Sequence, residues 1–272
     1  MQRRHLLKNL SILATGAALT AAAALAHADG KVIRLGTVSG PDAQVWQVAQ
    51  KVAKEKEGLD VKIVEFSDYV QPNAALDAGD LDANSFQHQP YLDSQIKQRG
   101  YKLVSVGLTY ISPMGVYSRK IKALKDLPQG ARVAVPNDPS NENRALLVLQ
   151  AQGLIKLKAG ASTGGNNATA LDIVENPKGL KFSELDAAQL PRTLGDVDAA
   201  VINTNFALAA GLRPFKDALA MEDLRSPYAN IIVVRVKDKD QPWVKKLVAA
   251  YQSPEVKAYI EKTFKGAMVA SF

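Results

Sequence analysis

The sequence contains no cysteine and very little histidine. None of its 272 residues is cysteine, and the only histidines are His5, His27 and His88. The lack of cysteine excludes disulfide bonds, thiolate metal ligands and a thiol nucleophile. Because His5 and His27 fall in an apparent N-terminal leader, the processed chain keeps one histidine, which excludes a multi-histidine metal site. We therefore expect neither a metal ion nor another cofactor.

The chain also has only a small excess of positive over negative charge. The chain has 34 Lys+Arg against 27 Asp+Glu, a net charge of +7, but Arg3, Arg4 and Lys8 lie in the leader, which has no acidic residue. Without residues 1–28, the remaining 244 residues carry +4. This surplus is small and mixed along the chain, so it does not favour a nucleic acid as the partner.

The N-terminus has the three parts of a signal peptide. A cationic start is followed by an Ala-rich apolar stretch over 10–25 and by the A-x-A cleavage signal at 26–28. The apolar stretch is shorter and weaker than the ~20 strongly apolar residues of a spanning helix, which disfavours a permanent anchor. The paired arginines also resemble a twin-arginine signal, so both export routes stay open. We predict a cleaved signal peptide over 1–28 and a location in a Gram-negative periplasm.

Beyond the leader, strand patterns alternate with helix patterns. Two C-terminal helices are expected over 242–252 and 254–265, each opened by proline. Alternation of this kind indicates βαβ units, a largely parallel sheet and an α/β fold. The expected strands cover 31–36, 61–66, 81–86, 103–107, 131–135 and 199–202.

One internal repeat suggests two similar halves. The sequence Gly-Asp-Leu-Asp-Ala at 79–83 recurs as Gly-Asp-Val-Asp-Ala at 195–199, and a strand–turn–helix pattern precedes each copy. Chance recurrence of an ordinary Gly-Asp turn is the alternative. No Pro/Gly/Ser-rich tether divides the halves, so we expect crossing segments at 108–118 and 228–235. Gly115 and the Ser-Pro pair at 226–227 are candidate hinge positions.

Polar residues follow four of the expected strands, where ligands bind in open α/β sheets. The clearest is 136–144, where a strand leads into a helix whose free N–H groups and positive dipole end would face the crevice. Arg144, one turn into this helix, could grip a carboxylate with two bonds. The alternative is a surface arginine paired with a neighbouring acid.

Aromatic residues gather after two other strands. Tyr69, Phe86 and Tyr91 would form an apolar wall with two polar tips, although each could also be an ordinary core residue. His88 between them could donate a hydrogen bond, act as a base or cap its helix. These residues favour an apolar ligand side chain.

Three asparagines complete the candidate site. Asn203, Asn205 and Asn230 offer both donors and acceptors, which suits a zwitterion with an ammonium and a carboxylate. Asparagine is also a common turn residue, so each position alone is a weak signal.

Several longer blocks carry a family resemblance. The chain resembles the NlpA lipoprotein family from about residue 31 to its end, and blocks of this length are far more specific than a short motif. The matching blocks are FSDYVQPN at 66–73, DANSFQHQPYL at 82–92, VPNDPSN at 135–141 followed by RAL at 144–146, DAAQLP at 186–191 and SPYANIIVVR at 226–235.

The resemblance implies a type II periplasmic-binding fold, with two α/β lobes formed by 29–112 plus 228–272 and by 113–227. It implies a monomer that captures methionine between the lobes and delivers it to the permease and ATPase of an ABC importer. On matching positions, Arg144 and Asn141 look like the carboxylate grip, and Asn205 and Asn230 look like partners of the α-amino and carboxylate groups. The side-chain pocket would be Tyr69, Phe86, His88 and Tyr91.

The chain departs from the family in one respect, and other functions stay open. Many relatives carry a lipidated cysteine at the processing site, whereas this chain has none and resembles a freely diffusing form. The ligand could instead be another apolar amino acid, a methionine derivative or a short methionine-containing peptide. A periplasmic enzyme with His88 as base is a further alternative, but no G-x-S-x-G, H-E-x-x-H or Walker motif is present. The last alternative is a surface adhesin that keeps the family fold but has lost the pocket.

Overall fold

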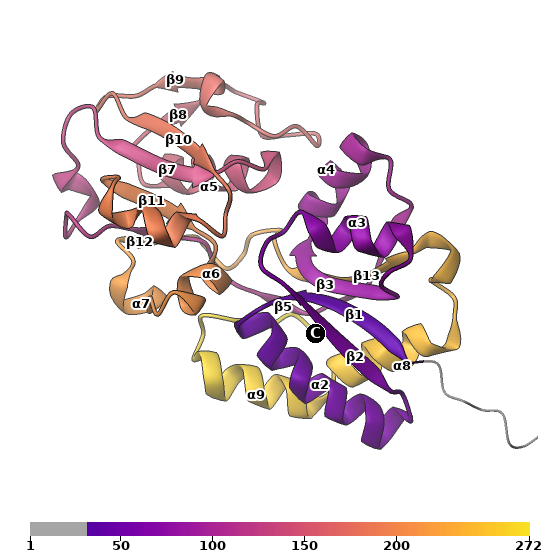
Figure 1. Ribbon diagram of the computed structural model, residues 1–272. Helices are drawn as coiled ribbons and strands as arrows, with labels where there is room; N and C mark the ends of the chain where they lie inside the picture. The colour runs from indigo at the N-terminus through magenta and orange to yellow at the C-terminus, as the bar shows by residue number, and fades with distance from the viewer. Residues whose placement is uncertain (1–31) are drawn as a thin grey trace, which may run out of the picture. The chain divides into compact units, whose positions relative to one another are not determined.

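The structure is a computed structural model and describes residues 32–272 (Figure 1). The predicted signal peptide lies outside the described residues. Secondary structure alternates as the sequence predicts, and the buried apolar side chains gather around two five-stranded sheets.

The first sheet has the order β2-β1-β3-β13-β4. Strand β1 pairs in parallel with β2 and β3, whereas β13 runs antiparallel between β3 and β4. Because β13 comes from near the C-terminus, the chain returns to this sheet after leaving it. The strands are β1 (Ile33–Val38), β2 (Val61–Phe66), β3 (Ala83–His88), β4 (Leu103–Leu108) and β13 (Asn230–Arg235).

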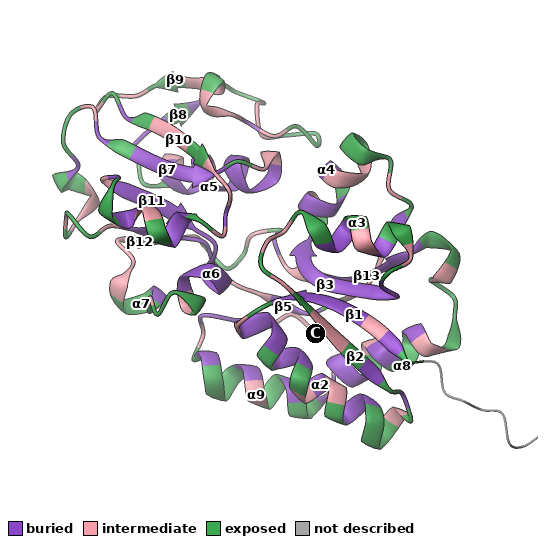
Figure 2. Ribbon diagram, in the orientation of Figure 1, coloured by how far each residue is buried: buried purple, intermediate pink, exposed green. Residues whose placement is uncertain are grey.

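Helix α2 shows why the helices of this half form where they do. Its apolar residues recur at helical spacing, so that Val45, Trp46 and Ala49 are buried in the core. The helix ends at Gly58, which takes the left-handed conformation that favours glycine. Helices α8 and α9 pack against α2, and their outward faces are exposed in Figure 2. The helices are α2 (Pro41–Glu57), α3 (Gln71–Ala78), α4 (Gln89–Arg99), α8 (Pro242–Tyr251) and α9 (Pro254–Phe264).

The second sheet repeats this arrangement, with the order β10-β7-β11-β6-β12. Its strand β7 pairs in parallel with β10 and β11, and β6 runs antiparallel between β11 and β12. In both sheets, counted in the orders given, the fourth strand is therefore antiparallel to the strands on either side of it. The strands are β6 (Gly115–Tyr117), β7 (Arg132–Pro136), β10 (Lys181–Leu185), β11 (Ala199–Ile202) and β12 (Ala220–Met221).

The remaining elements are short. Two small sheets pair β5 with β14 and β8 with β9. The elements are α5 (Pro139–Ala151), α6 (Thr204–Ala209), α7 (Pro214–Asp217), β5 (Tyr110–Ile111), β8 (Lys156–Leu157), β9 (Ile173–Glu175), β14 (Val269–Ala270), and the 3-10 turns η1 (Leu124–Asp126), η2 (Ala170–Asp172), η3 (Leu190–Gly195) and η4 (Val236–Asp238).

The internal repeat has the same physical role in both halves. The Asp82 carboxylate accepts a hydrogen bond of 2.9 Å from the backbone N–H of Arg34 at the start of β1. The Asp198 carboxylate accepts one of 2.8 Å from the backbone N–H of Arg132 at the start of β7. Each repeat therefore fixes the third strand in its sheet order beside the second, β3 beside β1 and β11 beside β7.

Gly115, a candidate hinge, is the first residue of β6. A Cβ atom there would lie 2.7 Å from the Tyr117 ring and 2.9 Å from the Met221 sulfur. Close packing thus requires glycine at this position.

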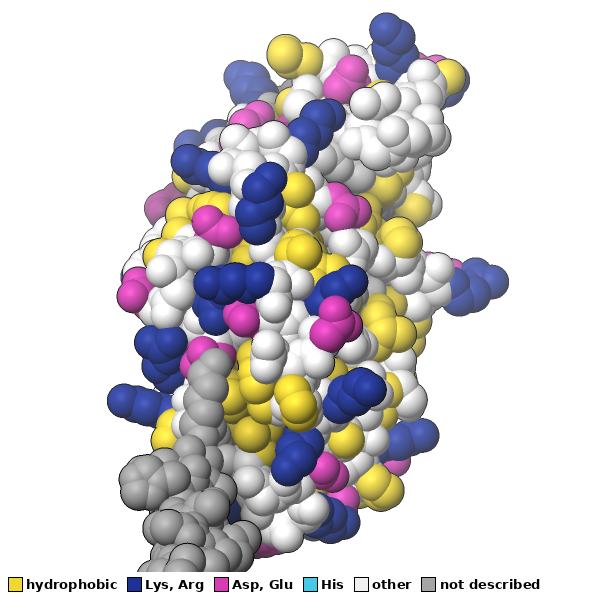
Figure 3. Space-filling model, turned by 90° about the vertical axis from the view of Figure 1, so that its right-hand side faces the viewer, with side chains coloured by type: hydrophobic (Ala, Val, Ile, Leu, Met, Phe, Trp, Pro, Cys, Tyr) yellow, Lys and Arg dark blue, Asp and Glu magenta, His cyan; other side chains and the backbone are white. Residues whose placement is uncertain are grey.

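The surface charge is as mixed as the sequence indicates. On the face shown in Figure 3, lysine and arginine side chains alternate with aspartate and glutamate and do not gather in one patch. No helix within residues 32–272 is long and apolar enough to cross a membrane.

Candidate functional site

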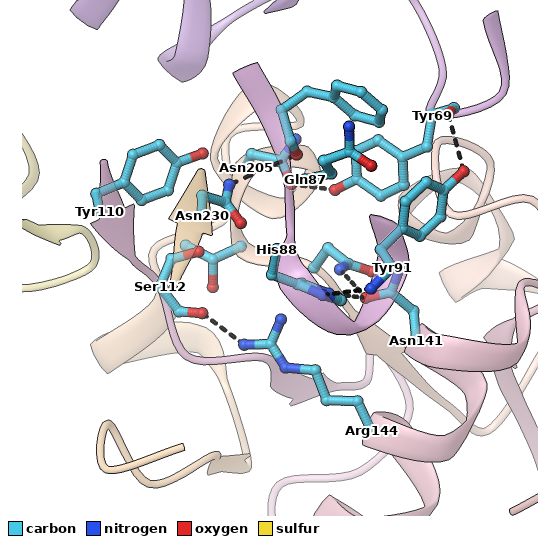
Figure 4. Close-up of a pocket in the computed structure, with 13 residues that line it drawn as sticks. Tyr69, Gln87, His88, Tyr91, Tyr110, Ser112, Asn141, Arg144, Asn205 and Asn230 are labelled. Atoms are coloured by element: carbon cyan, nitrogen blue, oxygen red, sulfur yellow. Dashed lines mark hydrogen bonds between the residues drawn. The ribbon is translucent and has the colours of Figure 1, made fainter. Parts of the chain in front are cut away.

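All eight predicted site residues line one cavity (Figure 4). Their side chains come from strands β3 and β13 of the first sheet, from the turn after β2 and from helices α4, α5 and α6. The lining residues are Tyr69, Phe86, Gln87, His88, Tyr91, Tyr110, Ser112, Asn141, Arg144, Asn203, Thr204, Asn205 and Asn230.

The aromatic residues form one wall of the cavity. The ring centroids of Tyr69, Phe86 and Tyr91 are 5.8–6.1 Å apart, and Phe206 lies 4.8 Å from Tyr69. The Tyr91 hydroxyl donates a 2.8 Å hydrogen bond to the backbone carbonyl of Tyr69. The Tyr69 hydroxyl donates one of 2.7 Å to Asn205 Oδ1. Since Asn205 belongs to α6, this bond links the two halves across the cavity.

His88 ends β3 and caps helix α4. Its Nδ1 accepts the Tyr91 backbone N–H at 3.2 Å, so the ring proton is on Nε2, which lies 3.2 Å from Asn141 Oδ1. Burial and the positive charge of Arg144 lower the His88 pKa to about 3. The imidazole is therefore neutral, and both of its nitrogens are engaged. Capping the helix and donating a hydrogen bond, which the sequence left as alternatives, occur together.

Asn141 stands in the first turn of α5 and is held by its neighbours. Its Nδ2 donates to the helix-capping carboxylate of Asp138 at 2.9 Å, and its Oδ1 also accepts a 2.9 Å bond from Asn203 Nδ2. Burial raises the Asp138 pKa to about 6. The Asn141 oxygen is thus used by two donors, and its amide nitrogen donates to both oxygens of Asp138, at 2.9 and 3.1 Å.

Arg144 is buried, with 4% of its side chain exposed, so its interpretation as a surface arginine is wrong. It does pair with an acid: Nε donates to the Glu222 carboxylate at 3.0 Å, while Nη2 donates to the Ser112 carbonyl at 2.7 Å. Tyr228 stacks on the guanidinium, 4.4 Å away. Among the described residues, Nη1 has no hydrogen-bond partner, and Figure 4 shows the guanidinium facing the cavity.

Sequence reasoning missed four lining residues: Gln87, Tyr110, Ser112 and Thr204. Tyr110 and Ser112 lie in the predicted crossing segment 108–118, whose position along the cleft could have indicated them. Asn203 was weighed as a zwitterion partner and does line the cavity. Glu222, the partner of Arg144, follows an edge strand and had no signal in the sequence.

The site offers no evident metal position. Within residues 32–272, no three histidine, aspartate or glutamate side chains are grouped so that they could hold a metal ion. The cavity presents aromatic rings, amides, a neutral imidazole and one arginine, which suits a small zwitterion with an apolar side chain.

Two α/β lobes with matching sheet orders and a ligand cavity between strand ends define a substrate-binding protein of the type II periplasmic-binding fold. A sequence model of the family described as NlpA lipoprotein matches residues 33–272. The chain belongs to the NlpA lipoprotein family.

Its relatives include proteins named for methionine. The D-methionine-binding lipoprotein MetQ of Salmonella typhi is 57% identical over 89% of each chain. A nutrient-binding protein from Burkholderia cenocepacia, solved bound to methionine, is 80% identical, has a TM-score of 0.88 and matches 89% of this chain and all of its own. A crystal structure of the methionine-binding protein MetQ is 55% identical, with a TM-score of 0.85, over 88% of this chain and 98% of its own.

Proposed function

We propose that this protein is a periplasmic substrate-binding protein that captures methionine between its lobes and delivers it to the permease and ATPase of an ABC importer. The observation that carries the proposal is the cavity itself, where an aromatic wall faces an arginine and several amides. The relatives named for methionine support the same ligand. The lack of cysteine leaves no residue for lipidation at the processing site, which supports a freely diffusing protein.

The lining residues give the ligand one orientation. The thioether lies among Tyr69, Phe86 and Tyr91, where apolar burial contributes ~1.5–3 kcal/mol and sulfur–aromatic contact ~0.3–1.5 kcal/mol. The carboxylate lies at Arg144, and the ammonium lies at Asn205 and Asn230. Charge-assisted hydrogen bonds contribute ~1.5–3 kcal/mol each. Since micromolar affinity corresponds to ~8 kcal/mol, a few such contacts suffice after ordering costs.

The lobes are the segments 29–112 plus 228–272 and 113–227. Bonds such as Tyr69 to Asn205 and His88 to Asn141 join residues of the two segments around the cavity. A ligand that contacts both lobes favours the closed arrangement, because only that arrangement makes every contact. The importer then recognises the closed form.

Calorimetry with L- and D-methionine, together with mass spectrometry of the native and the denatured protein, tests the proposal. We expect binding with one site per chain and recovery of unchanged methionine. A thermal-shift panel of apolar amino acids, methionine derivatives and dipeptides supplies the comparison. If a dipeptide or another amino acid stabilises the protein more than methionine does, the ligand is not methionine.

Catalysis by His88 has little support from the site. A general base needs a free lone pair, whereas His88 Nδ1 is occupied by a backbone N–H and Nε2 carries the proton. The low pKa also makes this imidazole a weak base. Chemical turnover of methionine by the purified protein would reverse this assignment.

A further inference from the structure

A buried carboxylate without an ion-pair partner stands behind one end of the cavity. Asp42 lies in the first turn of α2, with 2% of its surface exposed. Within residues 32–272, no lysine, arginine or histidine forms a salt bridge with it, and its Oδ2 atom has no hydrogen-bond partner. A buried charge of this kind is costly unless a positive charge compensates it.

The groups around Asp42 connect it to the cavity. Its Oδ1 accepts a hydrogen bond from the Tyr110 hydroxyl, and the Asn205 side chain also favours its charged form. Both Tyr110 and Asn205 line the cavity. The phenols of Tyr69 and Tyr251 also feel the charge of Asp42, which adds to the rise of their pKa. None of these phenol or amide groups supplies a positive charge.

The hydrogen bond to Asp42 fixes the polarity of Tyr110. A phenol has one proton to donate, and Tyr110 donates it to Asp42, so the lone pairs of its oxygen remain for the cavity. Asn205 Oδ1 accepts the Tyr69 hydroxyl on the same side. Figure 4 shows Tyr110, Asn205 and Asn230 at one end of the cavity and Arg144 at the other. The end away from Arg144 is therefore rich in acceptors.

We propose that Asp42 is a positioning residue for the ligand's ammonium group, which supplies the positive charge that this buried carboxylate lacks. Ionised Asp42 orients the Tyr110 hydroxyl so that its oxygen can accept an ammonium N–H. Protonated Asp42 would itself need an acceptor, and Tyr110 could then turn its proton toward the cavity. The inference rests on the proposed function, because it assumes an amino-acid ligand.

The electrostatics of Asp42 predict how affinity depends on pH. Burial raises the Asp42 pKa to about 7 in the absence of ligand. A bound ammonium favours the charged carboxylate, so the pKa is lower in the complex than in the free protein. Affinity for methionine should therefore fall as the pH drops below about 7, through the range between these two pKa values.

The test uses Asp42→Asn, which keeps the shape and an acceptor oxygen but removes the charge. Calorimetry compares methionine with its desamino analogue, 4-(methylthio)butanoate, which keeps the carboxylate and the thioether. At pH 7.5 the variant should bind methionine at least tenfold more weakly than wild type and the analogue within twofold. Its methionine affinity should also be flat from pH 6 to 8. Asp80→Asn, at an exposed aspartate, is the matched control.

The outcomes separate the inference from the proposed function. If wild type does not bind methionine, both fail. If wild type binds but Asp42→Asn binds methionine within twofold of it, or loses both ligands equally, Asp42 has no role toward the ammonium. Carbon-13 NMR of the Asp42 carboxyl in wild type gives an independent reading that needs no variant. Its pKa should fall when methionine is added, and an unchanged pKa contradicts the inference.

Discussion

The two halves share one arrangement of strands but bring different chemistry to the cavity. Each has a sheet with an antiparallel strand between its third and last parallel strands, and each fixes its third strand through an aspartate, Asp82 or Asp198. The first half supplies the aromatic wall, whereas the second supplies Asn141, Arg144 and Asn205. Under the proposed function, the first lobe holds the apolar side chain of the ligand and the second holds most of its polar head.

The aspartates at matching positions of the two halves differ in their burial and in their partners. Asp82 is buried and contacts two arginines, Arg34 and Arg235, while Asp198 is partly exposed and pairs with Lys120. Both halves also have an acid at the start of their first α-helix, the buried Asp42 in α2 and the half-buried Asp138 that caps α5. Variants at these positions and at the cavity residues can therefore test how burial and partners affect stability and binding.

The largest effect is expected for Asp82→Ala compared with Asp198→Ala. Removing Asp82 leaves the buried Arg235 with one carboxylate fewer, so the free energy of unfolding should fall by about 3–5 kcal/mol. Removing Asp198, whose ion pair with Lys120 is partly exposed, should lower the free energy of unfolding by about 1 kcal/mol or less. Urea denaturation measures both. Equal losses would mean that burial does not distinguish the two repeats.

Arg144→Ala should weaken methionine binding by about 2–5 kcal/mol, because the buried carboxylate loses its positive partner. The variant also leaves Glu222 unpaired, so calorimetry should include Arg144→Ala combined with Glu222→Gln, which separates folding from binding. Binding within twofold of wild type would remove Arg144 from the site.

Tyr69→Ala should reduce methionine affinity by about 1.5–3 kcal/mol, because the aromatic wall loses a ring that covers the apolar side chain. Alanine, if it binds, should lose less, since it has no thioether to contact the wall. Tyr69→Phe keeps the ring and loses only the bond to Asn205, for about 0.5–1.5 kcal/mol. If Tyr69→Ala weakens both amino acids equally, the wall does not recognise the side chain.

Asp138→Asn should change the pH dependence of stability. The folded-state pKa of Asp138 is raised from 3.8 to about 6, so the folded protein binds more protons than the unfolded chain between these values. Its contribution to stability is therefore present below about pH 4 and is lost as the pH rises through about 6. Asparagine also caps helices well. The variant should match wild type near pH 4 and exceed it by about 1–3 kcal/mol at pH 8, since one pKa unit is about 1.4 kcal/mol. Urea denaturation at both pH values measures this. If the variant and wild type differ in their free energy of unfolding by the same amount at pH 4 and at pH 8, the prediction is wrong.

Periodicity and turn residues were enough to predict most of the fold. The strands at 61–66 and 199–202 and both C-terminal helices agree with the structure to within a residue. Strand β10 was missed because all of its residues are exposed or half-buried, without the alternation that would give a clear apolar pattern. Short strands such as β6 and β12 depend on tertiary pairing and have little signal of their own.

The site was predictable where residues follow strands and unpredictable where the chain crosses between sheets. The eight predicted site residues were found because strand ends and matching family blocks indicated them. Tyr110 and Glu222 act through partners distant in the sequence, Asp42 and Arg144, so no local pattern could indicate their roles. Long-range pairing of polar groups requires the three-dimensional structure.

The most direct test of the central claim is a crystal structure of the protein with bound selenomethionine. The anomalous signal of selenium locates the ligand side chain without any assumption about its orientation. We predict a selenium peak among Tyr69, Phe86 and Tyr91, with the ligand carboxylate at Arg144. A peak beside Arg144, or outside this cavity, would contradict the account.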